Sequence, residues 1–169
     1  MVALAVIVGL GGGLGAVAFR YLVYGATWLV TGVEQYGVDP GAASAHLPWL
    51  GRWFVLAAPV AGGLVIGPLV QRFAPEARGH GVPEVMLAVT EQGGRIRPQV
   101  TIVKALASAI CIGTGGSVGR EGPIVQIGSA LASTLGQGVR LTENRLRLLV
   151  ACGAAAGISA TFNAPLTGV

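Results

Sequence analysis

The stretch GTGGSVGREGPIVQIG, residues 113–128, places Arg120 beside Glu121 in a glycine-rich segment that leads to Pro123. These charges stand out, because the 169-residue chain is 53% hydrophobic and only 11% charged, with a mean hydropathy of +0.70. A soluble domain carries about 25% charged residues, so this chain has too few charges to cover a water-facing surface. Its 28 glycines are typical of closely packed membrane helices. We therefore predict an all-α integral membrane protein.

Two apolar runs, residues 2–30 and 53–70, are long enough to cross a bilayer, which takes about 20 helical residues. The later helices are expected to be short or opened by proline, as in transporters whose binding sites use broken helices. Their expected ranges are 82–92, 99–112, 124–135 and 142–156, with one more helix opening at Asn163. This pattern predicts a bundle of tilted, broken and re-entrant helices.

The arginines predict how the chain is oriented in the membrane. The gap at residues 31–52 holds Glu34, Asp39 and a single arginine, whereas the later gaps hold most of the others. These are Arg72, Arg78, Arg95, Arg97, Arg140, Arg145 and Arg147. Under the positive-inside rule the arginine-bearing gaps face the cytoplasm. We expect a multi-pass protein of the plasma (inner) membrane and no nucleic-acid partner, because the net charge of +4 forms no basic patch interleaved with aromatics.

Small residues and isolated polar groups within the apolar runs have structural interpretations. Glycines at four-residue spacing predict helix-packing faces; they are Gly9, Gly11, Gly13, Gly15, Gly63 and Gly67. Cys111 and Cys152 predict neither a disulfide nor a metal site, and no cofactor is expected. Lys104 is expected to extend its ammonium group to the membrane surface. The alternative is that its positive charge makes the electric field inside the protein, along any pore, more electropositive. Glu84 is expected to be a first-turn acid on the cytoplasmic side.

Two glycine-bracketed turns each deliver a proline to the start of a helix. They are Gly79-His80-Gly81-Val82-Pro83 and Gly119-Arg120-Glu121-Gly122-Pro123. Proline suits a first helical turn, and glycine permits the positive φ that lets backbone N–H groups converge. At membrane depth, irregular backbone is tolerated only around a cavity or under protein. The two helix N-termini are therefore predicted to point at one interior spot, which favours an anion.

Glu121 lies at the head of the second of these helices, where its carboxylate would compete with an anion for the same amides. Ionisable residues within the membrane are functional-site candidates. We interpret Glu121 as a gate that blocks the path when ionised and swings away when protonated. Arg120 is expected to support the loop or its local field. The alternatives are an ion pair between Glu121 and Arg120, or a simple first-turn acid.

These residues carry a resemblance to a known family. GREGP at residues 119–123, continuing as IVQIGS, resembles the signature of the CLC family of chloride channels and proton-coupled chloride exchangers. GHGVPE at 79–84 and GAAAGISATFNAPLTG at 153–168 are similar to further segments of that family. The resemblance implies chloride or a related anion as the transported ligand, with protons as the second ion in exchangers. It also implies a homodimer with one pore per subunit, each subunit being built of two inverted halves.

The resemblance also implies roles for particular residues. Glu121 matches the gating glutamate. The residues that match the surroundings of the external and central anion sites are Gly119, Arg120, Gly122, Pro123 and Ile124. The residues that match the loop on the inner side of the central site are Gly79, His80, Gly81, Val82 and Pro83.

The sequence departs from the family pattern in two places. His80 stands where the family usually has a serine that coordinates the anion, so the preferred anion stays open. A protonated imidazole would strengthen the site at low pH; alternatively, the ring turns aside.

The family's second half does not follow, so residues 1–169 are expected to form the N-terminal half of the transmembrane domain. Such a half should not make a complete pore alone, and a truncated, non-conducting fragment or an assembly partner is the alternative. Channel and exchanger both stay open.

Two enzyme-like patterns are interpreted as coincidental. Residues 115–119 fit G-x-S-x-G, but the hydrolase motif needs a strand before Ser117, and the segment before it is predicted to be a helix. The same glycine-rich run lacks the lysine and hydroxyl residue of a phosphate-binding loop. We therefore expect no enzymatic activity.

Overall fold

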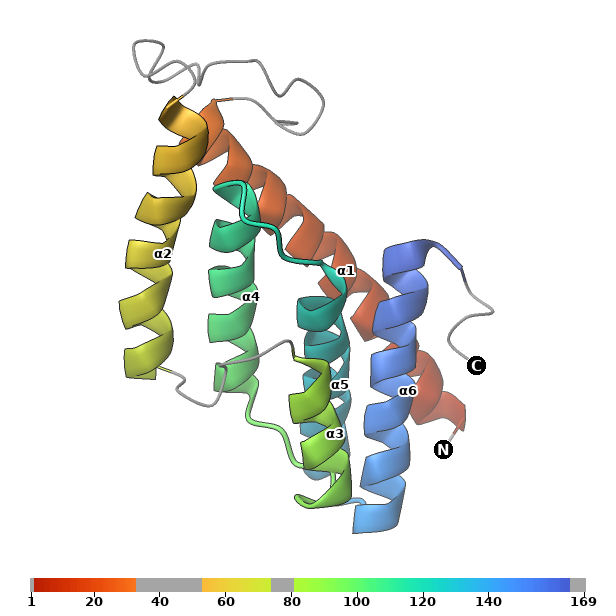
Figure 1. The fold of residues 1–169 in the computed structure, drawn as a ribbon. Helices are drawn as coiled ribbons and strands as arrows, with labels where there is room; N and C mark the ends of the chain where they lie inside the picture. The colour runs from red at the N-terminus through yellow and green to blue at the C-terminus, as the bar shows by residue number, and fades with distance from the viewer. Residues whose placement is uncertain (1, 33–52, 74–80, 165–169) are drawn as a thin grey trace.

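The computed structural model describes residues 2–32, 53–73 and 81–164. Over these ranges the chain forms six α-helices (Figure 1). In chain order they are α1 (Val2–Thr31), α2 (Phe54–Phe73), α3 (Val82–Thr90), α4 (Pro98–Gly113), α5 (Glu121–Gly138) and α6 (Glu143–Phe162). The described residues outside the helices form turns and irregular connections, which confirms the predicted all-α fold.

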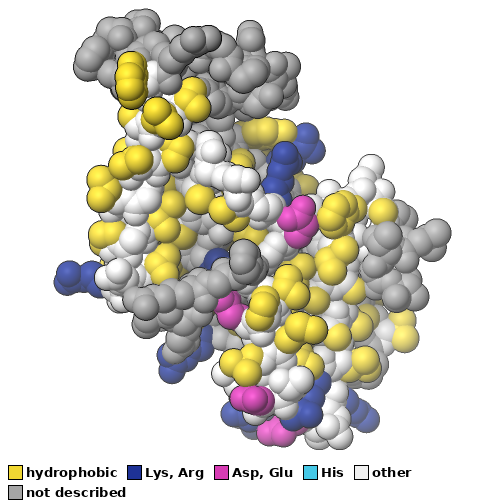
Figure 2. All heavy atoms as spheres, in the orientation of Figure 1, with side chains coloured by type: hydrophobic (Ala, Val, Ile, Leu, Met, Phe, Trp, Pro, Cys, Tyr) yellow, Lys and Arg dark blue, Asp and Glu magenta, His cyan; other side chains and the backbone are white. Residues whose placement is uncertain are grey.

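Three of these helices, α1, α2 and α6, are long and apolar enough to cross a membrane. Their outer faces carry large apolar side chains that are well exposed, among them Leu14 on α1 and Leu64 on α2. Figure 2 shows such side chains spread over α2 and the faces beside it. A soluble protein rarely exposes so much contiguous apolar surface, so lipid is the solvent that fits these faces.

The helix α5 forms the centre of the bundle and contacts α1, α3, α4 and α6. Its closest partner is α6, because glycines let the two backbones touch. A Cβ added to Gly153 would collide with the carbonyl oxygen of Gly128, and one added to Gly157 would lie 2.8 Å from the carbonyl oxygen of Ile124. The largest apolar cluster joins α5 to α6, α1 and α3 and includes Leu149.

The predicted glycine faces are only partly confirmed. A Cβ added to Gly15 would lie 2.9 Å from Ile127 on α5, but one added to Gly9 or Gly13 would meet nothing within 4 Å. Gly63 and Gly67 also lack neighbours within that distance. The close contact on α2 instead involves one residue earlier, where a Cβ on Gly62 would lie 2.5 Å from the Thr114 hydroxyl oxygen. Successive helical residues are rotated by 100°, so adjacent glycines face different neighbours.

The boundaries of two helices differ from expectation. α5 begins at Glu121, ahead of Pro123, and ends at Gly138. The first four N–H groups of a helix have no partner within it, so Pro123 is tolerated as the third residue. α6 follows Thr142 as predicted but runs on to Phe162, past the expected end at 156, and the Thr142 side chain makes no capping hydrogen bond.

Asn163 terminates α6, and the helix expected to open at residues 163–165 falls largely outside the described residues, so it stays a prediction. The Asn163 backbone is left-handed, with φ 52°, and its N–H donates to the Ser159 carbonyl at the end of α6. Asparagine tolerates this conformation better than most residues, and left-handed residues commonly terminate helices. Residues 165–169 lie outside the described part of the chain.

Candidate anion site

The start of α3 is set by Gly81, which has φ 88° and is buried. Val82 and Pro83 follow as the first helical residues, and both are exposed. The Val85 N–H donates to the Gly81 carbonyl over 3.2 Å, which makes this the first bond of the helix. The N–H groups before Val85 therefore have no acceptor within α3. Gly79 and His80, also predicted site residues, lie outside the described residues.

The start of α5 carries most of the remaining predicted residues. Gly119, Arg120 and Glu121 are exposed, Gly122 is partly buried, and the last two, Pro123 and Ile124, are buried. The Glu121 carboxylate folds back over Gly119, at the place that a side chain there would occupy. Within the described part of the chain Arg120 and Glu121 form no ion pair with each other. Glu121 is thus a first-turn residue with an accessible carboxylate.

The two helix starts meet. A Cβ added to Gly81 would lie 2.8 Å from the carbonyl oxygen of Gly122, in the first turn of α5. Figure 1 shows α3 lying beside α5, with both helices running away from this contact toward the same end of the molecule. Two sets of unpaired amides and two positive helix ends therefore lie near one another. This is the geometry that the paired proline motifs predicted, for the residues that the structure describes.

A buried ion pair supports the first turn of α3. The Lys104 Nζ, on α4, donates to both carboxylate oxygens of Glu84 over 2.8 and 2.7 Å. The Lys104 side chain is 6% exposed and that of Glu84 is 23% exposed. The prediction that Lys104 extends to the membrane surface is therefore wrong, because a partner lies closer. Membrane-embedded charges usually pair, so the sequence indicates that Lys104 has a partner but does not indicate that the partner is Glu84.

Gln126 was not predicted to belong to the site. It is 3% exposed and lies one turn after Gly122 on α5. Its Oε1 is buried without a hydrogen-bond partner and would lie 3.3 Å from a Cβ on Gly81. Buried polar atoms are nearly always satisfied, so an unpartnered oxygen next to a predicted site points to a missing donor such as water. The sequence signal that could have pointed to Gln126 is its position as a polar residue within an apolar run.

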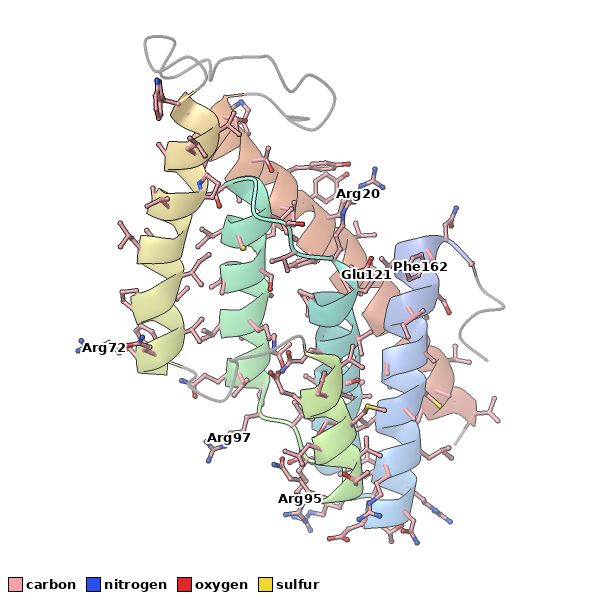
Figure 3. The ribbon with its side chains drawn as sticks, viewed as in Figure 1. Arg20, Arg72, Arg95, Arg97, Glu121 and Phe162 are labelled. Atoms are coloured by element: carbon pink, nitrogen blue, oxygen red, sulfur yellow. The ribbon has the colours of Figure 1, made fainter. Side chains whose placement is uncertain are left out.

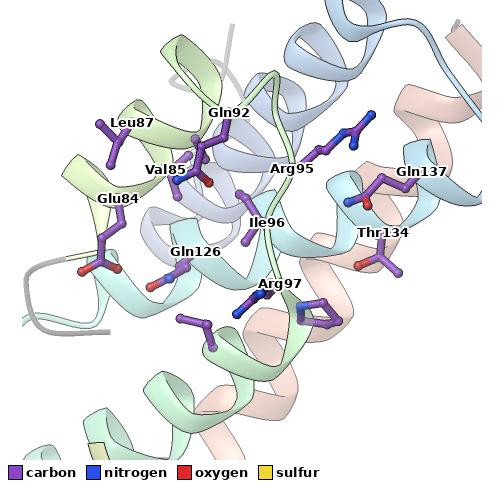
Figure 4. Close-up of a pocket in the computed structure, with 13 residues that line it drawn as sticks. Glu84, Val85, Leu87, Gln92, Arg95, Ile96, Arg97, Gln126, Thr134 and Gln137 are labelled. Carbon is purple, nitrogen blue, oxygen red and sulfur yellow. The ribbon is translucent and has the colours of Figure 1, made fainter. Parts of the chain in front are cut away.

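A groove of about 770 Å³ begins beside Gln126 and Glu84. Figure 4 shows these two side chains at one end of it, with Arg95, Thr134 and Gln137 toward the other. Figure 3 shows Arg72, Arg95 and Arg97 toward one end of the bundle and Arg20 and Glu121 well away from it. Among the described residues, then, Arg72 in the last turn of α2 and the arginines after α3 lie toward one end of the molecule.

Two further chemistries, metal binding and a serine nucleophile, can be compared with the described residues. They contain no group of three or more His, Cys, Asp or Glu side chains that would hold a metal ion. Cys111 and Cys152 are free thiols in this structure. Ser117 follows the helix α4 and a turn, not a strand, so the hydrolase-like pattern lacks its structural context.

Comparison with known proteins accounts for this arrangement. Residues 62–169 match the family model described as voltage gated chloride channel. The chain is 36% identical to a protein of Ralstonia nicotianae named as a ClcB-like chloride channel protein, over 99% of this chain and 39% of that protein. It is 38% identical to the H⁺/Cl⁻ exchange transporter ClcA of Cronobacter sakazakii, over 98% of this chain and 34% of that protein.

The transporter ClcA of Salmonella arizonae is similar to the same extent, with 39% identity over 98% of this chain and 34% of its own length. The chain thus spans a little over a third of the length of these relatives. No solved structure matches it significantly. The family model covers most of the chain, including both proline-headed turns. This chain belongs to the voltage-gated chloride channel family, and it is a membrane protein of that family rather than an enzyme.

Proposed function

We propose that the chain is the N-terminal half of an anion-transporting transmembrane domain, and that chloride or a related anion passes where the starts of α3 and α5 meet. The observation that carries this proposal is the contact between Gly81 and Gly122, which brings two proline-headed helix starts together. The relatives named as chloride channels or H⁺/Cl⁻ exchange transporters support chloride, with protons as the second ion of an exchanger.

The energetics favour transient binding of an anion. Removing an ion from water costs several kcal/mol even after relaxation. Each helix N-terminus contributes up to about 2 kcal/mol in partly buried geometry, and charge-assisted amide hydrogen bonds add about 1.5–3 kcal/mol each. The cation at α4, Lys104, is already neutralised by Glu84. The anion is therefore held by dipoles and amides, which permits release as well as binding.

In this proposal Glu121 is the gate. It is the first residue of α5, so its carboxylate competes with the anion for the same amides. We assign Gly81, Val82 and Pro83 to the inner side of the central site, and Gly119, Arg120, Gly122, Pro123 and Ile124 to the surroundings of the anion on the α5 side. Gly79 and His80, which lie outside the described residues, are assigned to the inner side by the family resemblance alone. Because that resemblance has a serine at the position of His80, the proposal leaves the preferred anion open.

The complete protein is proposed to contain a second, inverted half and to act as a homodimer in the plasma (inner) membrane. The arginine-bearing end of the bundle faces the cytoplasm, because positively charged segments are retained there.

The test is Glu121→Gln in the full-length protein, reconstituted into liposomes for anion efflux. Glutamine is neutral at every pH, so the path should stay open and the rise in flux on acidification should disappear. Glu143→Gln is the matched control, because Glu143 is the first residue of α6 as Glu121 is of α5. Flux and pH response that are unchanged in Glu121→Gln would refute the gate.

A further inference from the structure

The turn that ends α5 holds an arginine at a position that favours glycine. The Arg140 N–H donates to the Gln137 carbonyl and the Leu141 N–H donates to the Gly136 carbonyl, each over 3.0 Å. This pair of bonds forms a helix ending that is usually completed by a left-handed glycine, and Arg140 takes that place with φ 55°. Glycine would close the same turn with less strain. The positive charge at this position therefore needs an explanation outside the turn.

A second exposed arginine, Arg145, lies five residues later in the first turn of α6. Within the described part of the chain, neither Arg140 nor Arg145 forms an ion pair. The carboxylate of Glu143 lies elsewhere, against the α3–α4 connection, because a Cβ added to Gly93 would be 3.2 Å from the Glu143 Cδ. Residues 143 and 145 are also about 200° apart around a helix. The end of α5 and the start of α6 thus present two uncompensated positive charges.

These two arginines border a surface that faces lipid. The helix α6 is long and apolar enough to cross a membrane, and the well exposed Leu148 lies one turn after Arg145 on the same face. Val139, next to Arg140, is also well exposed. Figure 2 shows charged side chains gathered at the end of the molecule where α6 begins, with apolar side chains over the helices beyond them. Basic groups beside apolar surface are suited to the level of the lipid headgroups.

We propose that Arg140 and Arg145 bind the phosphate of an anionic phospholipid, whose acyl chains lie against Val139 and Leu148. Guanidinium groups bind phosphate oxygens through paired, charge-assisted hydrogen bonds. A free phosphate ion would match the arginines but would leave the two apolar side chains without a partner, so the arrangement favours a lipid. The site requires only that the protein lies in a membrane, so it holds or fails independently of anion transport.

The experiment uses the full-length protein with its cysteines replaced by alanine and a fluorophore on Ala151→Cys, because Ala151 is exposed one turn after Leu148. The protein is reconstituted into vesicles of phosphatidylglycerol and phosphatidylcholine in equal amounts, and one of the two lipids carries brominated acyl chains that quench the fluorophore. Because the bromine lies at the same depth in both lipids, the ratio of the two quenching efficiencies measures the local enrichment of anionic lipid. Leu64→Cys is the control, because Leu64 is exposed in the middle of α2.

Phosphatidylglycerol should be enriched at Ala151→Cys and not at Leu64→Cys. Arg140→Gln and Arg145→Gln should each lower the enrichment about two- to fivefold, because one arginine near a membrane surface attracts anionic lipid up to about fivefold. Arg95→Gln should leave it unchanged, because Arg95 is exposed at the same end of the molecule but on the α3–α4 connection. An equal loss in Arg95→Gln would indicate a diffuse surface charge and would overturn the site. Absence of enrichment when both arginines are present would also overturn it.

Arg140→Gly separates lipid binding from folding. Glycine suits the left-handed turn, so this variant should unfold at a higher temperature than the wild type in neutral detergent and yet lose lipid enrichment. An unchanged enrichment in Arg140→Gly would show that the arginine does not hold the lipid.

Inorganic phosphate tests the other source of the same chemical group. At equal ionic strength it should displace no more phosphatidylglycerol than chloride does. If phosphate abolished the enrichment, the arginines would recognise the free anion and the lipid assignment would be wrong. Anion efflux from the same vesicles keeps the two proposals apart, because enrichment without efflux would count against the proposed function alone.

Discussion

Gly81 and Gly122 bring two helix starts into backbone contact. A Cβ on Gly81 would lie 2.8 Å from the Gly122 carbonyl oxygen, and Gly81 has φ 88°. Both facts require a residue without a side chain, one for space and the other for conformation. The meeting of α3 and α5, on which the anion site depends, therefore requires glycine at position 81, which faces the backbone carbonyl of Gly122, 41 positions later in the chain.

Gly81→Ala should destabilise the protein through both effects. A positive φ costs a residue with a Cβ about 1–2 kcal/mol, and overpacking adds about 1–3 kcal/mol. Gly115→Ala is the matched control, because Gly115 also has φ 88° but no neighbour within 4 Å of an added Cβ. Unfolding of the purified full-length protein in detergent would measure the difference. Equal losses of stability in the two variants would show that the contact with Gly122 does not matter.

The sequence predicted this part of the fold because the necessary signals are local. Each proline-headed turn contains its own glycines and proline within five residues; these predicted the start of α3 at residue 82 and that of α5 to within three residues. Length and apolarity likewise predicted the membrane-spanning helices α1 and α2. The helix end at Asn163 was missed, because asparagine can open a helix as a cap or close one in the left-handed conformation.

The parts that were missed depend on contacts between helices. Lys104 and Glu84 are 20 residues apart on different helices, so neither sequence neighbourhood reveals the pair. The preference for Gly62 over Gly63 on α2 is set by the position of Thr114 on α4. Gln126 became part of the site only when α3 was found to lie beside α5. Sequence periodicity gives the faces of a helix but not the neighbour of each face.

The ion pair of Lys104 and Glu84 should be asymmetric in its effect on stability. Glu84→Gln leaves a deeply buried lysine without its partner, and breaking a buried pair in this way costs about 3–5 kcal/mol. Lys104→Gln leaves Glu84, whose side chain is 23% exposed, so the loss should be smaller. The double variant should recover part of the loss, because no uncompensated charge is left. Equal and additive losses in a double-mutant cycle would contradict this account.

The contact between α5 and α6 should not tolerate even a methyl group. Gly153→Ala would place a Cβ against the Gly128 carbonyl and 2.8 Å from the Ala132 Cβ. Separating two backbones in the core should cost about 3 kcal/mol or more, at the upper end for overpacking. Gly63→Ala is the control, because its Cβ would meet nothing within 4 Å and alanine favours a helix by about 0.5–1 kcal/mol over glycine. In detergent, Gly153→Ala should therefore unfold at a lower temperature than the wild type, and Gly63→Ala at a higher temperature.

The connection that carries Arg95 depends on one buried hydroxyl. Ser133 on α5 is fully buried, donates to the Gly94 carbonyl over 2.7 Å and accepts from the Ile96 N–H over 2.9 Å. Ser133→Ala would leave both backbone groups without a partner, and each unsatisfied buried group costs about 1–3 kcal/mol. It should also release residues 94–96 from α5.

Ser159→Ala is the matched control for this last variant, because the Ser159 hydroxyl donates only to the Ala155 carbonyl within its own helix. That carbonyl keeps its helical partner when the hydroxyl is lost, so the stability should change by less than about 0.5 kcal/mol. Hydrogen exchange at the Ile96 amide provides a local measurement that a general loss of stability would not reproduce. Because Ser133 holds this amide directly, its exchange should accelerate more than that of the amides in α1. Uniform acceleration throughout the protein would show that Ser133 acts by packing alone and does not fix the position of Arg95.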